Sequence, residues 1–485
     1  MKTIIGLEIH VELATKTKMF CSCKNVFGQA PNTVVCPVCL GHVGTLPRVN
    51  KKAVEYAVKA GLAFDCEIHD NMKFDRKKYY YPDLTKGYQI TQQDQPIATE
   101  GFLEIESEQG PKKVRIERIH LEEDTGKSTH TDDGHTLLDY NRAGVPLIEI
   151  VSRPDMASAE EARQFLENLR QRLRFIGVSD VKMEEGSLRC DVNINIVDDQ
   201  GNKSGIAEIK NLNSFRSVVR AIEHEEVRQA ELLAQGEDTT KETRRWDEAS
   251  QSTILMRKKD EATDYRFTVD SDLPRLVLSR EFIDEIRNTL PELPNAKKVR
   301  YMEEYKLTEY DANVLSQNKE IAGLFEETLK SIEDPTLVAN WIQTELMRRL
   351  KEYEIDPSEM KLSIENFSKL LKLVKDEKIS NNTGKKVLRE IFDSNEDPEK
   401  IVQERGLIQV SDTAFLESLV TEVLDENPQS IEDFKAGKDR ALGFLMGQIM
   451  KKSKGKANPQ QVNKMLQEEL NKRWKFMFLL QTKTN

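Results

Sequence analysis

Several strand-like segments carry ionisable side chains at every second position, the spacing that puts side chains on one face of a β-strand. Glu8 and His10 form one such pair, and Glu208 and Lys210 form another. The polar face of 191–195 adds Asp191, Asn193 and Asn195 to these candidates, and the segment 120–124 (HLEED) adds an acidic cluster at a strand end. Carboxylate oxygens with one imidazole suit Mg²⁺ that holds nucleotide phosphates, and a nearby ammonium would balance a transferred phosphoryl group. The alternative is the ordinary polar face of a half-exposed sheet.

Four of the six cysteines lie close together near the N-terminus. Cys21 and Cys23 form a C-x-C pair, and Cys36 and Cys39 form a C-x-x-C pair that Gly41 follows. Four thiolates in two close pairs suit tetrahedral Zn²⁺, and Gly41 lets the chain turn its amides toward the sulfurs. Such a site would clamp a loop and leave no open position for chemistry. A redox C-x-x-C pair and unconnected buried thiols are the alternatives.

Two further segments are basic. Residues 76–89 (RKKYYYPDLTKGYQ) interleave basic residues with four tyrosines, which suits base stacking or phosphate contact but also ordinary strand formation. Residues 435–456 hold seven basic residues and one acidic residue, a net charge of +6. This second window matches a phosphate-backbone footprint on a small helical domain, and a solvated lysine face is the alternative.

Overall the chain is acidic, with 72 Lys and Arg against 83 Asp and Glu in 485 residues and a net charge of −11. Taken alone, this charge argues against a nucleic-acid partner. The basic window leaves −17 for the remainder, so the average does not exclude a contact surface in that window. No apolar stretch is long enough for a membrane span, and Glu8 interrupts any signal-peptide core, so we expect a soluble, cytoplasmic protein. The chain lacks the glycine-rich motifs of P-loop and Rossmann proteins and the G-x-S-x-G elbow of hydrolases.

The elements that must position these residues change near residue 293. Before it, alternating apolar residues predict strands at 3–12, 191–196 and 207–210, and a 3.6-residue spacing predicts helices at 158–176 and 214–233. After the proline-containing segment 290–294 (LPELP), few stretches have the alternating pattern of a strand, and a series of amphipathic helices is predicted. A break at 404–406 precedes Ser411, a suitable N-cap. We therefore predict an α+β fold in three domains: 1–293 with an antiparallel or mixed sheet, an all-α domain at 294–405, and a small all-α tail at 406–485.

Taken together, these motifs resemble the B subunit of the bacterial tRNA-dependent amidotransferases, along nearly the whole chain. The residues that carry the resemblance are IGLEIHVEL (5–13), the CSC and CPVCLG cysteine pairs, YPDL (81–84), HLEEDTGK (120–127), DYNRAGVPL (139–147), GSLRCDVN (186–193), EIKNLNSF (208–215), TRRW (243–246), ALGFLMGQ (441–448) and KGKANP (454–459). So many motifs in order make a specific signal.

The resemblance implies a cradle-shaped domain that uses ATP and Mg²⁺ to phosphorylate the side-chain carboxylate of misacylated Glu-tRNA(Gln) or Asp-tRNA(Asn). It implies ammonia delivered through a channel from a glutaminase A subunit, a small C subunit that completes a heterotrimer, and a tail domain that binds tRNA. By position, Glu8, His10 and Glu123 would be magnesium ligands, with Asp191 and Glu208 as further candidates. Lys77 and Lys86 would lie on the ammonia path or at the acyl end, and the four cysteines would be a zinc knuckle.

Some positions depart from the family pattern. Val43 and Thr85 stand where proline is usual, residues 262–270 lack the usual His and Tyr-Phe-Pro-Glu run, and the chain continues beyond the expected end at 472–485. Two other classes of function compete with the ligase subunit. One is a non-catalytic tRNA-binding scaffold or diverged paralogue, and the other is a free-standing zinc-ribbon protein that binds nucleic acid without partners.

Overall fold

The structure is a computed structural model. It describes residues 1–237, 239–258, 265–408, 413–435, 438, 440–453 and 457–481, which form two compact units, Met1–Ala296 and Lys297–Asn485. Predicted features that lie outside the described residues are Ser411, Lys454 and Lys456 of the basic window, 262–264 of the divergent segment and the end of the extension, 482–485.

A nine-stranded sheet organises the first unit, in the order β14-β13-β12-β11-β1-β10-β7-β6-β2. Its strands are β1 (Lys2–Glu12), β2 (Glu67–Ile68), β6 (Ala98–Ser107), β7 (Gly110–Glu123), β10 (Pro146–Ser152), β11 (Leu188–Val197), β12 (Ala207–Lys210), β13 (Glu242–Asp247) and β14 (Ser252–Lys258). Neighbours pair antiparallel, except that β12 and β13 are parallel. The first strand of the chain lies in the middle, so its polar residues have neighbours on both sides.

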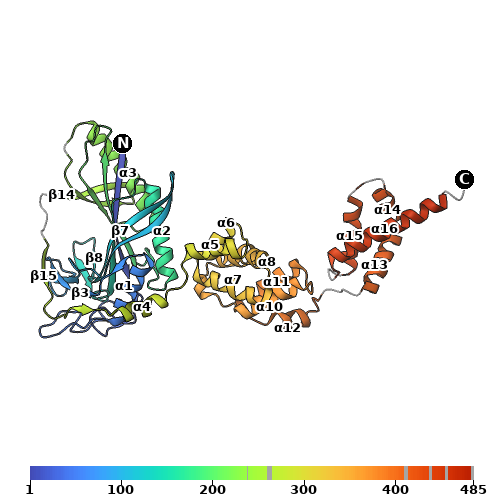
Figure 1. Cartoon of the computed structure of the whole chain (residues 1–485), viewed down its shortest axis with the longest axis horizontal. Coiled ribbons are helices and arrows are strands. Elements are labelled where there is room, and N and C mark those ends of the chain that lie inside the picture. Colours follow the sequence, from blue (N-terminus) through green and yellow to red (C-terminus); the bar gives the residue numbers. More distant parts are fainter. Residues whose placement is uncertain are drawn as a thin grey trace. The chain divides into compact units, whose positions relative to one another are not determined.

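The alternation along β1 divides the sheet into an apolar face and a polar face. Ile5, Leu7 and Ile9 are buried, whereas Glu8 and His10 remain partly exposed. The apolar face shares one hydrophobic core with helices α1 (Lys51–Ala63), α2 (Ala159–Phe175) and α3 (Phe215–Ala234) (Figure 1). Since side chains of alternate residues point to opposite faces, the polar residues of β1 point away from these helices.

Local signals explain where the covering helices begin and end. Ser158 caps α2 by accepting a hydrogen bond from the Glu161 amide, and acidic residues of the first turn and basic residues of the last turn complement the helix dipole. Gly177, at a φ of 72°, follows the C-cap. Ser214 caps α3 in the same way. The predicted strands and helices of this unit are confirmed to within a few residues.

Smaller sheets bring loop segments to the end of β7. They are β15 (Arg266–Val269) with β4 (Asp75–Lys78) and β5 (Tyr88–Thr91), β16 (Leu276–Val277) with β3 (Asn71–Met72), and β8 (Lys127–His130) with β9 (Thr136–Asp139). Helix α4 (Arg280–Asn288) follows them. The side-chain amide of Gln89 in β5 donates to the Glu123 carbonyl at 2.8 Å, so the tyrosine-rich segment is joined to the acidic end of β7.

The second unit is built of helices around two separate hydrophobic cores. One core spans Tyr301–Val402 and the other Leu416–Leu470. The helices are α5 (Pro294–Glu304), α6 (Glu309–Ser316), α7 (Lys319–Ile332), α8 (Pro335–Trp341), a π-helical turn (Ile342–Leu346), α9 (Met347–Glu352), a 3₁₀ turn (Pro357–Glu359), α10 (Ile364–Lys375), α11 (Asn381–Ser394), α12 (Pro398–Glu404), α13 (Thr413–Glu426), α14 (Pro428–Lys435), α15 (Arg440–Lys452) and α16 (Pro459–Gln481).

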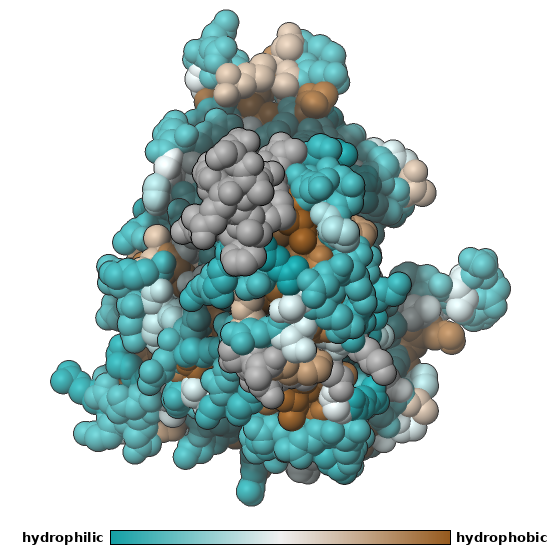
Figure 2. Space-filling model, turned by 90° about the vertical axis from the view of Figure 1, so that its right-hand side faces the viewer, coloured by the Kyte–Doolittle hydropathy of each residue, from teal (hydrophilic) through white to brown (hydrophobic). Residues whose placement is uncertain are grey.

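The predicted α+β class is confirmed. The first unit ends at Ala296, close to the predicted boundary at 293, and the two helical cores lie on either side of the predicted boundary at 405. Within the described residues, none of the helices combines the length and the apolar character that a membrane crossing requires. The face seen in Figure 2 is largely hydrophilic, with apolar residues in small separate areas.

Candidate active site

The strand register gathers ionisable side chains into a band across the polar face of the sheet. His10 of β1 lies opposite Glu149 of β10, which lies opposite His120 of β7. On the other side of β1, Glu8 lies opposite Asp191 of β11. The band continues into β12, so five adjacent strands contribute to it.

Within this band, His10, Glu122 and Glu149 form the first group that could hold a metal ion. His10 Nε2 lies 3.3 Å from Glu122 Oε1 and 3.5 Å from Glu149 Oε2. His120 Nε2 lies 3.1 Å from the same Glu149 oxygen, and the Thr91 hydroxyl donates to Glu122 Oε2 at 3.2 Å. Both carboxylates are buried, so each depends on these few partners.

The ionisable side chains of this group shift one another's pKa values. Burial alone would lower the pKa of His10, but the negative charges of Glu149 and Glu122 outweigh it and raise that pKa to about 10. Burial would raise the pKa of Glu122, but the imidazole rings of His10 and His120, whose Nε2 atoms lie 3.3 and 3.7 Å from its carboxylate oxygens, hold it well below its usual range. Among the described residues, Glu122 Oε1 and His120 Nδ1 are buried without a hydrogen-bond partner. Unsatisfied oxygen and nitrogen atoms around two carboxylates fit a divalent cation.

Glu8, Asp191 and Glu208 form the second group. Their ligand oxygens lie within 4.8 Å of one another. Asn193 Nδ2 donates to Glu8 Oε1 at 2.8 Å, and Lys210 Nζ lies 2.5 Å from Asp191 Oδ2 and 2.8 Å from Glu208 Oε1. Burial and the neighbouring carboxylates raise the pKa of Glu8. The structure thus brings together five of the predicted site residues, and an all-oxygen set of this kind fits Mg²⁺.

Glu123 belongs to neither group among the described residues, although the family resemblance implied that it lies with Glu8 and His10. It follows Ile119 and Leu121 of the apolar face in the alternation along β7, and its carboxylate accepts hydrogen bonds from Lys86 Nζ at 2.5 and 2.6 Å and from the Ile90 amide at 3.1 Å.

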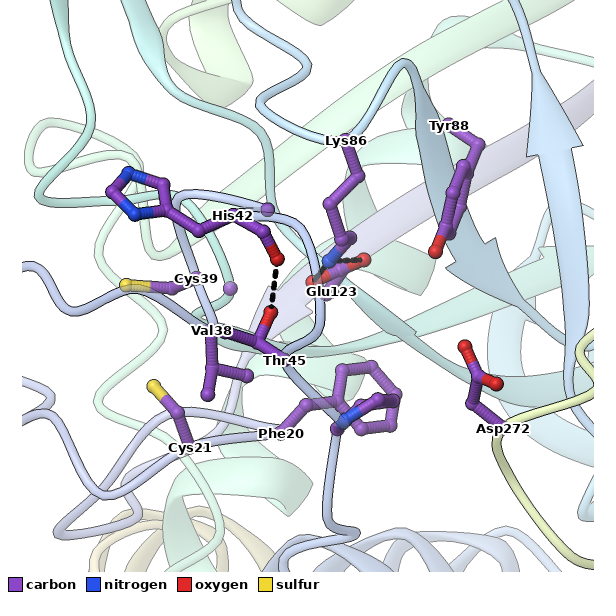
Figure 3. A pocket seen from close by; sticks show the side chains of 13 residues that line it. Phe20, Cys21, Val38, Cys39, His42, Thr45, Lys86, Tyr88, Glu123 and Asp272 are labelled. Atoms are coloured by element: carbon purple, nitrogen blue, oxygen red, sulfur yellow. Dashed lines mark hydrogen bonds and ion pairs between the residues drawn. The ribbon is translucent and has the colours of Figure 1, made fainter.

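This ion pair lines a separate cavity of about 130 Å³ (Figure 3). Its wall also contains Phe20, Tyr88 and Asp272, together with the cysteine loop. Figure 3 shows Lys86 and Glu123 pointing toward each other on one side of the cavity, with Cys39 and Cys21 on the other.

The four predicted zinc ligands converge. The sulfurs of Cys21, Cys23, Cys36 and Cys39 lie within 4.8 Å of one another, with Cys23 and Cys39 4.0 Å apart and Cys36 and Cys39 3.9 Å apart. A tetrahedral ion with Zn–S bonds of about 2.3 Å requires sulfurs about 3.8 Å apart.

The surroundings also fit a tetrathiolate site. The Cys36 amide donates to Cys39 Sγ at 3.2 Å, and the fully buried Lys18 places Nζ 3.7 Å from the same sulfur. A hydrogen bond from Cys21, with the charge of Lys18, lowers the pKa of Cys39 to about 4. Four thiolates around Zn²⁺ carry a net charge of −2, so a buried ammonium beside them is the expected compensation.

Two predicted binding features lie elsewhere. Lys77 in β4 places Nζ 4.8 Å from the centre of the Tyr265 ring. In the basic window, Lys452 is paired with Glu422 and Glu426 at 2.8 and 2.6 Å, and Asn458 caps α16 by accepting from the Gln460 amide at 2.9 Å. The window therefore contains α15 with its C-terminal end, as predicted, and stops before α16, which begins at Pro459.

Comparison with known proteins identifies the family. The model described as "GatB/GatE catalytic domain" matches residues 3–284, and the model described as "GatB domain" matches residues 323–470. The chain belongs to the GatB/GatE family. Relatives named as the B subunit of aspartyl/glutamyl-tRNA(Asn/Gln) amidotransferase are 56% identical over 471 residues in Finegoldia magna (97% of this chain, 100% of the relative) and 53% identical over 473 residues in Clostridium tetani (97% and 99%). The relative in Thermotoga neapolitana is 49% identical over 476 residues (97% and 99%).

In this GatB/GatE chain, the pattern-based prediction missed three residues in and around the first group. The prediction included His120 and Glu122 only as members of an acidic run. It did not apply the strand alternation to 120–123, which puts His120 and Glu122 on one face of the strand and Glu123 on the other. Glu149 was missed altogether. It is the single carboxylate in the apolar strand Pro146–Ser152, and a lone charge in such a strand signals a buried partner.

Proposed function

We propose that this chain activates the side-chain carboxylate of glutamate or aspartate on a misacylated tRNA with ATP and converts it to the amide. The full-length match to the B subunit of aspartyl/glutamyl-tRNA(Asn/Gln) amidotransferases supports tRNA-dependent amidation, and therefore a carbon–nitrogen ligase. The structural observation that carries the proposal is the pair of oxygen-rich groups that lie side by side across the sheet and meet at β1. Glu8 and His10 are two residues apart, about 7 Å along β1, and each belongs to a different group.

The chemistry needs two steps. An oxygen of the substrate carboxylate attacks the terminal phosphorus of ATP and releases ADP, and ammonia then attacks the acyl carbon, so that phosphate leaves and the amide forms. Mg²⁺ bound at the two groups would offset the repulsion between the carboxylate and the phosphates. His10, Glu122 and Glu149 would hold the first ion, and Glu8, Asp191 and Glu208 the second. Lys210 supplies a positive charge beside the second group.

The cavity of Lys86 and Glu123 suits the other reactant. Ammonia reacts as NH₃, and a carboxylate beside its path can take a proton from NH₄⁺ or from the attacking nitrogen. Glu123 lines this cavity beside Lys86, so its carboxylate lies where such a proton acceptor is useful. Zn²⁺ in the neighbouring cysteine loop would shape this cavity and take no part in the chemistry. Lys77, whose ammonium lies over the Tyr265 ring, remains a further candidate for the ammonia path or the acyl end.

The proposal extends to partners and location. An amidating subunit needs a source of ammonia, here a glutaminase A subunit, and we propose that a small C subunit completes a heterotrimer. The basic window, which contains α15, would contact the tRNA backbone. A complex of this kind acts on aminoacyl-tRNA in the cytoplasm.

The test separates a ligase subunit from a scaffold. The reconstituted complex is assayed for ATP hydrolysis stimulated by Glu-tRNA(Gln) or Asp-tRNA(Asn) without glutamine, and for amide formation with ammonium salt. Glu149→Gln should reduce both rates by about a hundredfold or more, because the site loses a charged ligand. Glu55→Gln is the matched control, since Glu55 pairs with Lys52 on the surface of α1, at 2.8 Å, and it should leave both rates unchanged. Normal rates in Glu149→Gln would favour the scaffold, and tight tRNA binding without partners would favour a zinc-ribbon protein.

A further inference from the structure

The ammonium of Lys210 lies inside the second carboxylate group. Its nitrogen is 2.5 Å from Asp191 Oδ2 and 2.8 Å from Glu208 Oε1, and the ligand oxygens of these two residues and Glu8 are within 4.8 Å of one another. Glu8 is held instead by the Asn193 amide. The ammonium therefore pairs with two of the three carboxylates in this group.

An ammonium and a divalent ion would need the same oxygen atoms. Mg²⁺ binds oxygens at about 2.0–2.1 Å, and a charged N–H···O bond spans about 2.8 Å, so both cations fit among carboxylate oxygens this close. They cannot share the position, because like charges at such distances repel strongly. Occupation of the group by a metal ion therefore requires the Lys210 ammonium to leave.

Lys210 has a route by which to leave. It is the last residue of β12, its side chain is 35% exposed, and the chain turns directly after it at Asn211, which has a φ of 64°. Four rotatable bonds let the ammonium swing without moving the strand. Lys86, by comparison, has a side chain only 14% exposed, and its ion pair with Glu123 is closed in by the cavity wall.

We propose that Lys210 is an internal substitute cation. It neutralises the group of Glu8, Asp191 and Glu208 while no metal is bound, gives way to the divalent ion, and then pairs with the phosphates that arrive with that ion. The inference rests on the proposed nucleotide and metal role of this group. It adds an exchange of cations, which keeps three partly buried carboxylates from facing one another uncompensated before substrate binds.

Removal of the ammonium has two opposite consequences. Lys210→Met leaves the metal ion without a competitor, so Mn²⁺ should bind this group about tenfold more tightly. The same variant deprives the phosphates of a positive partner, so KM for ATP should rise severalfold. Lys210→Arg keeps the charge and should remain close to the wild type in Mn²⁺ affinity. Damage to the fold would weaken both kinds of binding, so the opposite directions identify the exchange.

The experiment uses the assembled complex with the full chain. Mn²⁺ is titrated by calorimetry and electron paramagnetic resonance, and the binding component that Glu208→Gln abolishes defines the second group. Lys112→Met is the matched control, because Lys112 bonds Glu161 at 2.8 Å and its side chain is 30% exposed. It should change neither Mn²⁺ affinity nor KM.

Two results would overturn the inference, and they can be told apart. If Lys210→Met leaves the affinity of that component unchanged or weaker, Lys210 does not compete with metal, while the metal role of the group stands. If Glu208→Gln abolishes no component, the group holds no metal, and this part of the proposed function fails together with the exchange.

Discussion

Metal binding at the first group should expel protons. His10 lies between Glu149 and Glu122, whose charges raise its pKa from 6.5 to about 10. At pH 8 the protonated form then exceeds the neutral form about a hundredfold. A metal ion needs the neutral ring, so at least one proton must leave for every ion bound.

The magnitude follows from this linkage. Below a pKa of about 10, each pH unit changes the fraction of neutral His10 about tenfold, so Mn²⁺ affinity should rise about a hundredfold from pH 7 to pH 9. The rise should flatten near pH 10. The stability of the metal-free fold depends on pH in the opposite direction. The raised pKa of His10 stabilises the folded state fully below pH 6.5, and this contribution is lost as pH rises through about 10.

The assay is calorimetric titration of Mn²⁺ at pH 7, 8 and 9 in buffers of different ionisation enthalpy, which counts the protons released. His10→Asn should abolish most of the pH dependence. His130→Asn is the control, since His130 is exposed and bonded to the Thr136 hydroxyl at 2.8 Å, and it should leave the dependence intact. Affinity that does not vary with pH, with no proton release, would refute a charged His10 in this group.

Three further variants test the cysteine loop and the cavity. Cys39→Ser should remove zinc from the purified protein, and elemental analysis that still finds one equivalent would contradict the four-cysteine site. Gly41→Ala should lower stability to thermal unfolding by at least about 1 kcal/mol more than Gly28→Ala. Both glycines have positive φ. A Cβ atom added at Gly41 would lie 2.7 Å from Lys86 Cγ, whereas a Cβ atom added at Gly28 would have no neighbouring atom within 4 Å. Glu123→Gln should cost about 3 kcal/mol in urea unfolding because it leaves Lys86 uncompensated, and the double variant with Lys86→Met should cost less; equal or additive losses would argue against the buried pair.

The elements that sequence periodicity predicted are those whose signal is local. The strand at 3–12 and the helix at 158–176 are each specified by alternating or 3.6-residue apolar spacing, and the helix also by a cap within the same segment. The convergence of Cys21 and Cys39 was likewise predictable, because paired cysteines at these spacings have few other common uses.

The grouping of the acidic residues was not predictable in the same way. It depends on which strands become neighbours and in which register, and β1 contacts β10 and β11, which begin more than a hundred residues later. A shift of one residue in register turns a side chain to the other face. Glu122 and Glu123 illustrate the effect, since one bonds to His10 across the sheet and its neighbour bonds to Lys86 in the cavity.

A departure from the family pattern has a structural counterpart at Thr85. Where proline is usual, the Thr85 hydroxyl donates to the Cys39 carbonyl at 2.7 Å, a bond that a proline side chain cannot make. The next residue, Lys86, packs against Gly41 of the cysteine loop and bonds Glu123. One hydrogen bond therefore ties the loop that carries Lys86 to the loop that carries the thiolates. The acceptor of this hydrogen bond belongs to a cysteine of the proposed zinc site, and its donor, Thr85, is joined to Lys86 by a peptide bond. A change in the conformation of the cysteine loop should therefore displace Lys86 relative to Glu123.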